Sequence, residues 1–195
     1  MLSAINRDLQ TAQKRHQVIS VARKRLKEKP LLGVVVVVTS DLVLLHRLDD
    51  GIRLDGYSLL RSRDVTRVDL ELPRAKFYHE ALRLRRQRPR RPRGIDLTEL
   101  AAGIMSAGLA FPLVAVHPER KHPGICWIGR PLAIQANELV LAYITPGATW
   151  EGEHHCRLSD VTRIDFGGAY EESLALVAEA RSSKSRARRT GKSKS

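Results

Sequence analysis

The hexapeptide Asp64-Val-Thr-Arg-Val-Asp69 occurs a second time, 96 residues further along the chain, as Asp160-Val-Thr-Arg-Ile-Asp165. Around these hexapeptides, residues 32–69 align with residues 128–165 without a gap, and glycines recur at the same places in both segments. Self-similarity at a fixed spacing is typical of a chain built from copies of one structural unit. The sequence therefore predicts two copies of one small unit.

Each copy consists of short apolar or alternating runs that are separated by turn residues. In the first copy the turns fall at Asp49-Asp-Gly51 and Asp55-Gly56, and in the second at Pro146-Gly147 and Glu151-Gly152. Asp-Gly favours tight hairpins because both central turn positions need a positive φ. Strands at such short spacings form an antiparallel meander, whose twist favours closure. We expect a mainly β, α+β fold of two tandem small β-barrel units.

Helices are expected beside these strands. A helix over residues 75–84 and another over 169–179 would close the two units, and a third over 97–109 would begin at Asp96 as its N-cap. The aspartate that opens each hexapeptide is expected to cap a one-turn helix. Residues 31–38 are apolar throughout and suit a buried strand.

These elements define the expected domain organisation. Repeat 1 covers residues 16–88 and repeat 2, with its leading helix, covers residues 97–180. A helical arm (residues 1–15) precedes them, a Pro/Arg linker (89–96) joins them, and a disordered basic tail (181–195) follows.

The Asp-x-Thr-Arg sequence, the expected strand order and the unit size resemble Sm-like and SH3-like small barrels. The two-copy layout, with its Pro/Arg linker and the run from Asp160 to Glu172, also resembles a family of uncharacterised bacterial proteins. That resemblance spans about residues 15–180; it implies a bacterial source and the layout, but no activity. Neither copy contains an Ile-Arg-Gly-type loop, so RNA recognition of the Sm type is not implied.

The net charge of +13 is concentrated in three tracts, residues 14–29, 83–93 and 181–195. Basic arms bind phosphate backbones without sequence specificity because they release counterions. The alternative is that these tracts only increase solubility. Aromatic residues make up 5% of the chain and do not interleave with the cations, which argues against a base-stacking platform. The candidate polyanion-binding residues are Arg85, Arg86, Arg88, Arg90, Arg91, Arg93, Lys184, Arg186, Arg188 and Arg189.

The two hexapeptides predict a structural motif. An arginine fork that bridges the two flanking aspartates would lock the turn. The residues concerned are Asp64, Thr66, Arg67 and Asp69 in the first copy, and Asp160, Thr162, Arg163 and Asp165 in the second.

Histidine and cysteine residues gather in the second copy, and both types bind zinc. Their spacing follows no standard zinc pattern, and the alternative is a buried thiol beside surface histidines. We therefore expect neither a metal nor another cofactor. The weak candidate ligands are His117, His122, Cys126, His154 and Cys156. Trp127 and Trp150 are expected in the core, with an apolar binding groove as the alternative.

No motif of an enzyme is present: the sequence has no glycine-rich phosphate loop and no Gly-x-Ser-x-Gly elbow. Residues 100–116 carry no charge, but they contain Gly103, Gly108 and Pro112 and are shorter than a membrane span. A helix followed by a strand is expected there, with a transmembrane segment as the alternative. The sequence thus predicts a cytoplasmic, non-enzymatic protein-interaction or adaptor module with a protein partner; the alternative is binding of nucleic acid or another polyanion.

Overall fold

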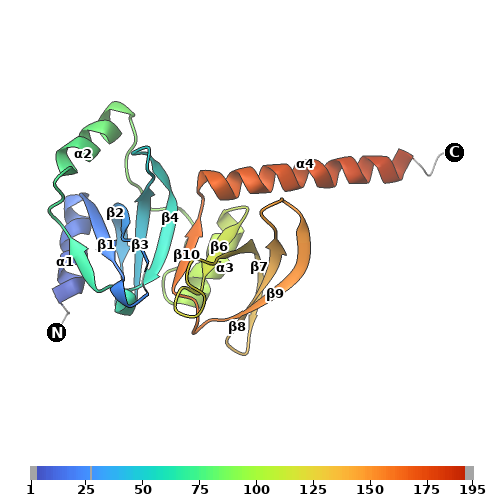
Figure 1. Ribbon diagram of the computed structural model, residues 1–195, viewed down its shortest axis with the longest axis horizontal. Coiled ribbons are helices and arrows are strands. Elements are labelled where there is room, and N and C mark those ends of the chain that lie inside the picture. Colours follow the sequence, from blue (N-terminus) through green and yellow to red (C-terminus); the bar gives the residue numbers. More distant parts are fainter. Residues whose placement is uncertain (1–3, 27, 192–195) are drawn as a thin grey trace.

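The computed structural model describes residues 4–26 and 28–191, and in them ten strands form one antiparallel sheet (Figure 1). The strand order is β5-β1-β2-β3-β4-β10-β6-β7-β8-β9. The first five strands are β1 (Val18–Ala22), β2 (Leu31–Val38), β3 (Leu42–Leu48), β4 (Leu54–Arg61) and β5 (Arg67–Asp69). The other five are β6 (Val114–His117), β7 (Trp127–Gln135), β8 (Glu138–Ile144), β9 (Trp150–Arg157) and β10 (Arg163–Phe166).

The sheet consists of two halves with the same strand order. In each half the fifth strand pairs with the first, so β5 lies beside β1 and β10 lies beside β6. The halves meet where β4 pairs with β10, with Leu59 opposite Ile164; we call this junction the seam. The mainly β, α+β class is as predicted. The strand pairing itself gives one open sheet that runs through both halves.

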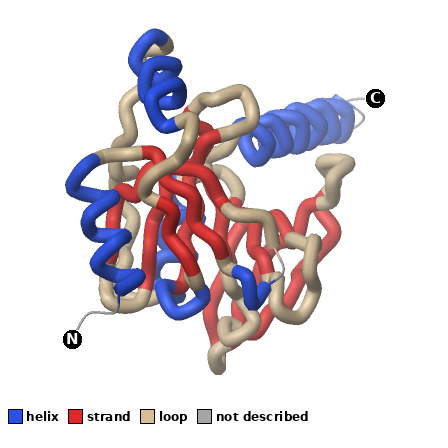
Figure 2. Tube along the Cα trace, turned by 60° about the vertical axis from the view of Figure 1, so that its left-hand side comes forward, coloured by secondary structure: helices blue, strands red, loops and turns tan. Residues whose placement is uncertain are grey.

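Helices lie around this sheet (Figure 2). They are α1 (Ala4–Arg15), α2 (Ala75–Leu84), α3 (Leu100–Ala110) and α4 (Ala169–Gly191). The predicted bounds of α2 are confirmed, whereas α3 begins after Glu99 rather than after Asp96, whose carboxylate instead accepts a hydrogen bond from the Thr98 amide. No helix within the described residues is both long and apolar enough to cross a membrane.

The hexapeptides correct one prediction. They do not form aspartate-capped helical turns: a 3₁₀ turn, Ser62–Asp64, ends at the first aspartate, and β5 follows. The Thr66 amide and hydroxyl both donate to the carbonyl of Ala22 on β1. Pairing with a neighbouring strand therefore overrides the local capping preference.

The C-terminal segment also differs from expectation. Helix α4 does not end near residue 179 but continues to Gly191, through much of the segment predicted to be disordered. Residues 192–195 of the expected tail lie outside the described residues.

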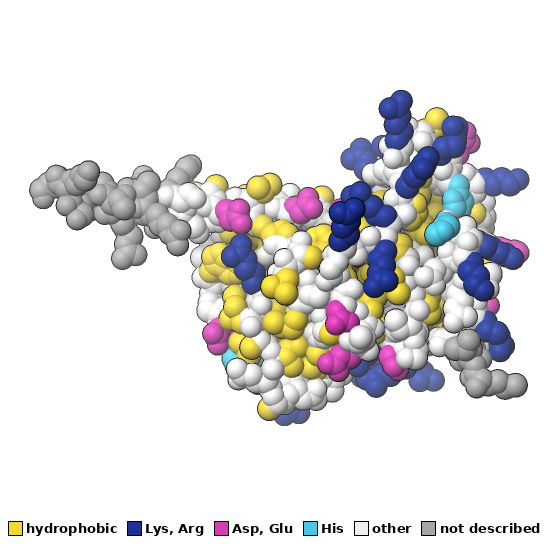
Figure 3. Space-filling model, turned by 180° about the vertical axis from the view of Figure 1, so that it is seen from behind, with side chains coloured by type: hydrophobic (Ala, Val, Ile, Leu, Met, Phe, Trp, Pro, Cys, Tyr) yellow, Lys and Arg dark blue, Asp and Glu magenta, His cyan; other side chains and the backbone are white. Residues whose placement is uncertain are grey.

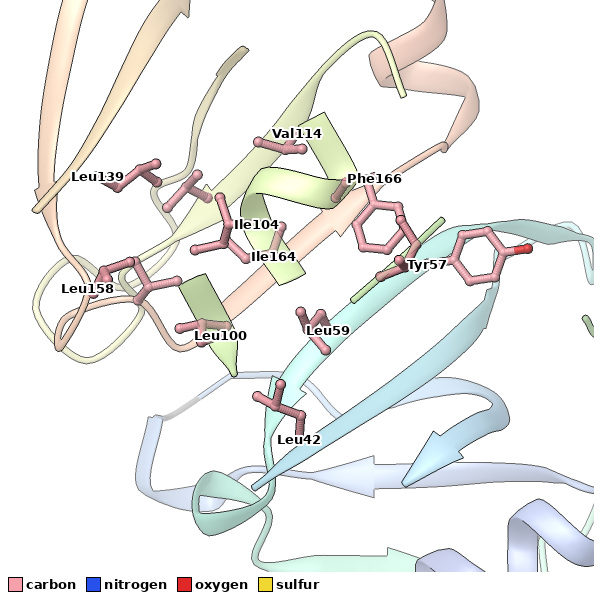
Figure 4. Packing of buried hydrophobic residues seen from close by; sticks show 14 of the residues in the cluster. Leu42, Tyr57, Leu59, Leu100, Ile104, Val114, Leu139, Leu158, Ile164 and Phe166 are labelled. Carbon is pink, nitrogen blue, oxygen red and sulfur yellow. The ribbon is translucent and has the colours of Figure 1, made fainter. Parts of the chain in front are cut away.

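An apolar cluster at the seam joins the two halves (Figure 4). Leu59 from β4 and Ile104 from α3 are fully buried in it, together with Ile164 and Phe166 from β10. Gly103 lets α3 approach closely, because a Cβ atom there would lie 2.6 Å from Leu59 Cδ2. Since both halves contribute to one core, they are held in a fixed relation.

Candidate polyanion-binding cleft

A cleft of about 850 Å³ opens where the linker between the two halves passes over the seam. The linker residues Arg90, Arg91 and Arg93 line this cleft, and they are exposed. Asp55 at the start of β4 and Glu172 on α4 also line it. On the face shown in Figure 3, Lys and Arg side chains gather on the part of the molecule away from α4.

The linker is held in place by specific contacts. The Arg90 amide lies 3.4 Å from Nδ1 of His46, and the Leu54 amide donates to the Gln87 side chain at 3.0 Å. Pro92 and Ile95 are buried. Because these contacts anchor the linker, its arginines are held at the cleft that they line.

The floor of the cleft is aromatic. The rings of His46 and Tyr57 stack at 4.4 Å, and Tyr57 stacks on Phe166 at 5.5 Å. His46 and Tyr57 are only 8% and 7% exposed, so their faces are covered and cannot stack on a base. The floor therefore supports the arginines but leaves them as the groups that meet a ligand.

Burial and a neighbouring charge shift the pKa values of the two floor residues. Burial, reinforced by the charge of Arg90, lowers the pKa of His46 to about 4, so this imidazole is neutral at pH 7. Burial raises the pKa of Tyr57, although a hydrogen bond with Arg90 opposes the rise. With both floor groups neutral, the charge of the cleft comes from the arginines and carboxylates that line it.

The negative charge of Asp55, one of the acidic residues that line the cleft, is partly neutralised. The Asp55 carboxylate accepts a hydrogen bond from the Ala169 amide at 2.7 Å, at the first turn of α4, and Arg47 lies 3.8 Å away. An N-terminal helix amide and a guanidinium both offset a negative charge. The three arginines of the linker thus determine the sign of the cleft.

Behind the cleft, a buried ion-pair cluster crosses the seam. Both guanidinium NH2 groups of Arg23 bind the Glu119 carboxylate, and these side chains are almost fully buried. Arg163 binds the same carboxylate at 3.0 Å, and Asp165 receives Arg47 at 2.8 Å and His117 at 3.1 Å.

The carboxylates of this cluster are held ionised. Burial alone would raise the pKa of Glu119, but the hydrogen bond from Arg23 and the charge of Arg163 keep it below its usual range. Burial would likewise raise the pKa of Asp165, and the hydrogen bond and charge of His117 outweigh it, with Arg163 and Arg47 adding to them. Both carboxylates are paired with cations or the imidazole of the cluster itself, which favours a structural role.

Each motif arginine contacts the aspartate two residues after it. Arg67 binds Asp69 at 2.8 Å, and Nε of Arg163 lies 3.3 Å from Asp165. The preceding aspartates have other partners: Arg120 binds Asp64 at 2.7 Å and Lys121 binds Asp160 at 3.1 Å. The threonines contact the first strand of their half: Thr66 donates to Ala22, and the Thr162 hydroxyl lies 2.9 Å from the carbonyl oxygen of His117. The same hydroxyl lies 2.7 Å from the Glu119 carboxylate, so its single proton has two possible acceptors.

The other candidate polyanion-binding residues lie apart from the cleft. Arg85 donates to the Gly51 carbonyl at 3.4 Å, Arg86 has a positive φ, and Arg88 is exposed. The candidates on α4 have side chains that lie outside the described residues; they are Lys184, Arg186, Arg188 and Arg189.

The candidate zinc ligands are spread over three environments. His122 and His154 flank Trp127, with ring centroids 5.7 and 4.0 Å from it. His117 belongs to the buried ion-pair cluster, Cys126 is exposed, and Cys156 is buried, which raises its pKa to about 11. In the part of the chain that the structure describes, no three His, Cys, Asp or Glu side chains converge as metal ligands.

The aromatic floor and the buried cluster were not found from the sequence. His46, Tyr57 and Phe111 come from separate segments, and Arg23 lies in a tract that otherwise looks like a solvated basic arm. The fold assembles both features, and no local pattern signals them.

No protein-family model, curated protein or solved structure matches this chain. The chemistry of its own residues therefore carries the functional interpretation.

Proposed function

We propose that this protein is a non-enzymatic binder of polyanionic chains, and that its site is the cleft over the seam. The observation that carries the proposal is the group of Arg90, Arg91 and Arg93 along a cleft of about 850 Å³. Guanidinium groups bind phosphate oxygens in a bidentate manner. An open cleft lined by such groups suits an extended phosphate backbone.

Contacts to phosphates, rather than to bases, are expected to dominate. The floor rings of His46 and Tyr57 are too covered to stack on bases. Binding through the backbone alone is insensitive to base identity and strongly dependent on salt. An oligouridylate and an oligoadenylate should therefore bind with similar affinity.

The test is binding of a fluorescent oligouridylate across a salt series, with a variant in which Arg90, Arg91 and Arg93 are replaced by Gln. Loss of three phosphate contacts should reduce the slope of log K against log salt by about 2. The matched control replaces Lys14, Arg15 and Arg25, which removes the same charge from exposed positions away from the cleft.

If both triple variants weaken binding equally, the cleft is not the site and the charge acts only in bulk. A chain ending at residue 180 separates a contribution of the basic tail from that of the cleft. Absence of binding, or binding that does not change with salt, would refute the proposal.

A second candidate is the protein-interaction or adaptor role that the sequence predicts. It is favoured by the two ends of the sheet, since β5 and β9 each pair on one side only. Exposed strand edges bind other strands through backbone hydrogen bonds. Capture of partners from a nuclease-treated cytoplasmic lysate, compared with an untreated one, separates protein partners from nucleic acid.

We further propose that the two halves are tandem units of one small-barrel type, of the Sm-like or SH3-like kind. The common strand order of the halves supports this. So does the correspondence of register: Val68 faces Val21 in one half as Ile164 faces Val116 in the other.

A further inference from the structure

The two ends of the sheet are equivalent to the two strands that meet at the seam. At the seam, the fourth strand of the first half (β4) pairs with the fifth strand of the second half (β10). The strands left at the ends are the fifth of the first half (β5) and the fourth of the second (β9). The molecule thus contains one such junction, between β4 and β10. Its two end strands, β9 and β5, are the equivalents of the strands that form this junction.

The space that the seam fills is empty at the outer edge. Gly56 on β4 and Gly152 on β9 have the same left-handed conformation, with φ of +66° and +76°. A Cβ atom on Gly56 would lie 2.6 Å from the Gly168 amide and 2.7 Å from the carbonyl of Phe166, so the chain after β10 lies directly against it. In the part of the chain that the structure describes, a Cβ atom on Gly152 would have nothing within 4 Å.

The arginines at the ends of β4 and β9 also differ between the seam and the outer edge. At the seam, Arg61 donates to the carbonyls of Val161 and Leu158 at 2.9 and 2.5 Å, across the junction. Its equivalent on β9, Arg157, is exposed. The carbonyls equivalent to the acceptors of Arg61 belong to Ser62 and Val65, just before β5.

The side-chain pairs that meet at the seam are replaced by histidine–aspartate pairs at the ends. Ser58 donates to Asp165 at 2.6 Å at the seam. The equivalent position on β9 is His154, whose Nε2 is buried without a hydrogen-bond partner among the described residues. The equivalent position on β5 is Asp69, which Arg67 binds at 2.8 Å. An imidazole therefore replaces the hydroxyl opposite the aspartate.

A second pair changes in the same way. Leu59 lies against Gly103 of α3. Helix α1 is the equivalent of α3, since Leu9 and Ala12 are fully buried at the positions of Ile104 and Ala107. The positions equivalent to Leu59 and Gly103 are then His155 and Asp8, again a histidine and an aspartate.

From these correspondences we infer that copies of this chain assemble head to tail, with β9 of one copy paired to β5 of the next in the register of the seam. In that register His155 lies opposite Val68 and His154 opposite Asp69, and Arg157 reaches the turn before β5. Because the two surfaces differ, the contact repeats and forms assemblies larger than a dimer. The polar pairs make this contact reversible, in contrast to the apolar seam. The inference names a second copy as the occupant for the protein-interaction candidate and does not depend on polyanion binding.

The test is a disulfide across the inferred contact. In a chain with Cys126 replaced by Ser, Val68→Cys and His155→Cys place two thiols opposite each other in neighbouring copies. The double variant should form a ladder of covalent oligomers beyond the dimer on mild oxidation. Each single variant should remain without cross-links. Dimers from one single variant would show two-fold edge pairing and would overturn the inference.

Charge reversal supplies a second measurement on the full chain. His155→Glu places an acid opposite Asp8, and also beside Glu138 and Glu153 of its own copy. It should weaken self-association about tenfold or more in sedimentation equilibrium. Adding Asp8→Lys should restore it. A wild-type chain that stays monomeric, or a lack of rescue, would overturn the inference. The variant lacking Arg90, Arg91 and Arg93 should assemble normally, so failure of polyanion binding and failure of assembly remain distinguishable.

Discussion

Arg67 and Arg163 occupy the same position in the two hexapeptides, but their surroundings differ. The Arg67 side chain is 56% exposed and binds the neighbouring Asp69, whereas that of Arg163 is 14% exposed and binds Glu119 and Asp165. The reason is the sheet: β5 is an end strand, and β10 lies between β4 and β6. Two local sequences that differ by one methyl group can therefore serve an exposed turn and a buried junction, depending on which strand comes to lie beside each of them.

The largest expected effect comes from replacing one of these two arginines. Arg163→Ala leaves two buried carboxylates short of a partner and should lower the free energy of unfolding by about 3–5 kcal/mol. Arg67→Ala removes an exposed ion pair and should cost about 0.2–1 kcal/mol. Urea denaturation of the two variants, read at equal m values, measures both. Equal losses would show that the buried cluster does not stabilise the seam.

Features with local causes were predictable from the sequence. The Asp-Gly turns and the recurring hexapeptides indicated the repeat and the strands, and the helix over Ala75–Leu84 followed from its own pattern. The prediction of helical turns at the hexapeptides is wrong because the first hexapeptide pairs with β1, a strand that is distant in sequence. Local capping and long-range pairing compete for the same amides.

The candidate site was only half predictable. The linker arginines stood out as a basic run, but their anchoring on His46 depends on a contact across 44 residues. Arg23 looked like one cation of a solvated tract, yet it is 1% exposed because Glu119, from the other half, lies opposite it. A buried ion pair requires both partners, and a sequence pattern shows only one at a time.

The second prediction uses pH to compare the halves. His46 stacks on the seam residue Tyr57, while the equivalent position of the other half is Ala142. Because burial lowers the pKa of His46 from 6.5 to about 4, the folded protein keeps it neutral while the unfolded chain takes up a proton. The stability that it contributes is complete above pH 6.5 and is lost as pH falls toward 4.

The loss amounts to about 3 kcal/mol by pH 4. Chemical denaturation at a series of pH values measures it, and His46→Phe provides the reference that keeps a ring on Tyr57 without a titrating nitrogen. The difference between the two chains, rather than either curve alone, isolates His46 from the carboxylates that titrate over the same range. Parallel curves would show that His46 is not buried as a neutral base.

The smallest effect comes from making the two hexapeptides identical. Ile164→Val gives the seam the sequence Asp-Val-Thr-Arg-Val-Asp that β5 already has, and it removes one methyl group from a fully buried position. We expect a loss of about 1 kcal/mol in the free energy of unfolding. The reciprocal change, Val68→Ile, adds that methyl group at a partly exposed position of the end strand and should alter stability by less than about 0.5 kcal/mol. If Val68→Ile instead stabilises the protein, and does so more at higher protein concentration, a second copy covers the end strand. The two hexapeptides then differ in that the second is always covered, within the seam, whereas the first is covered only while a second copy is bound.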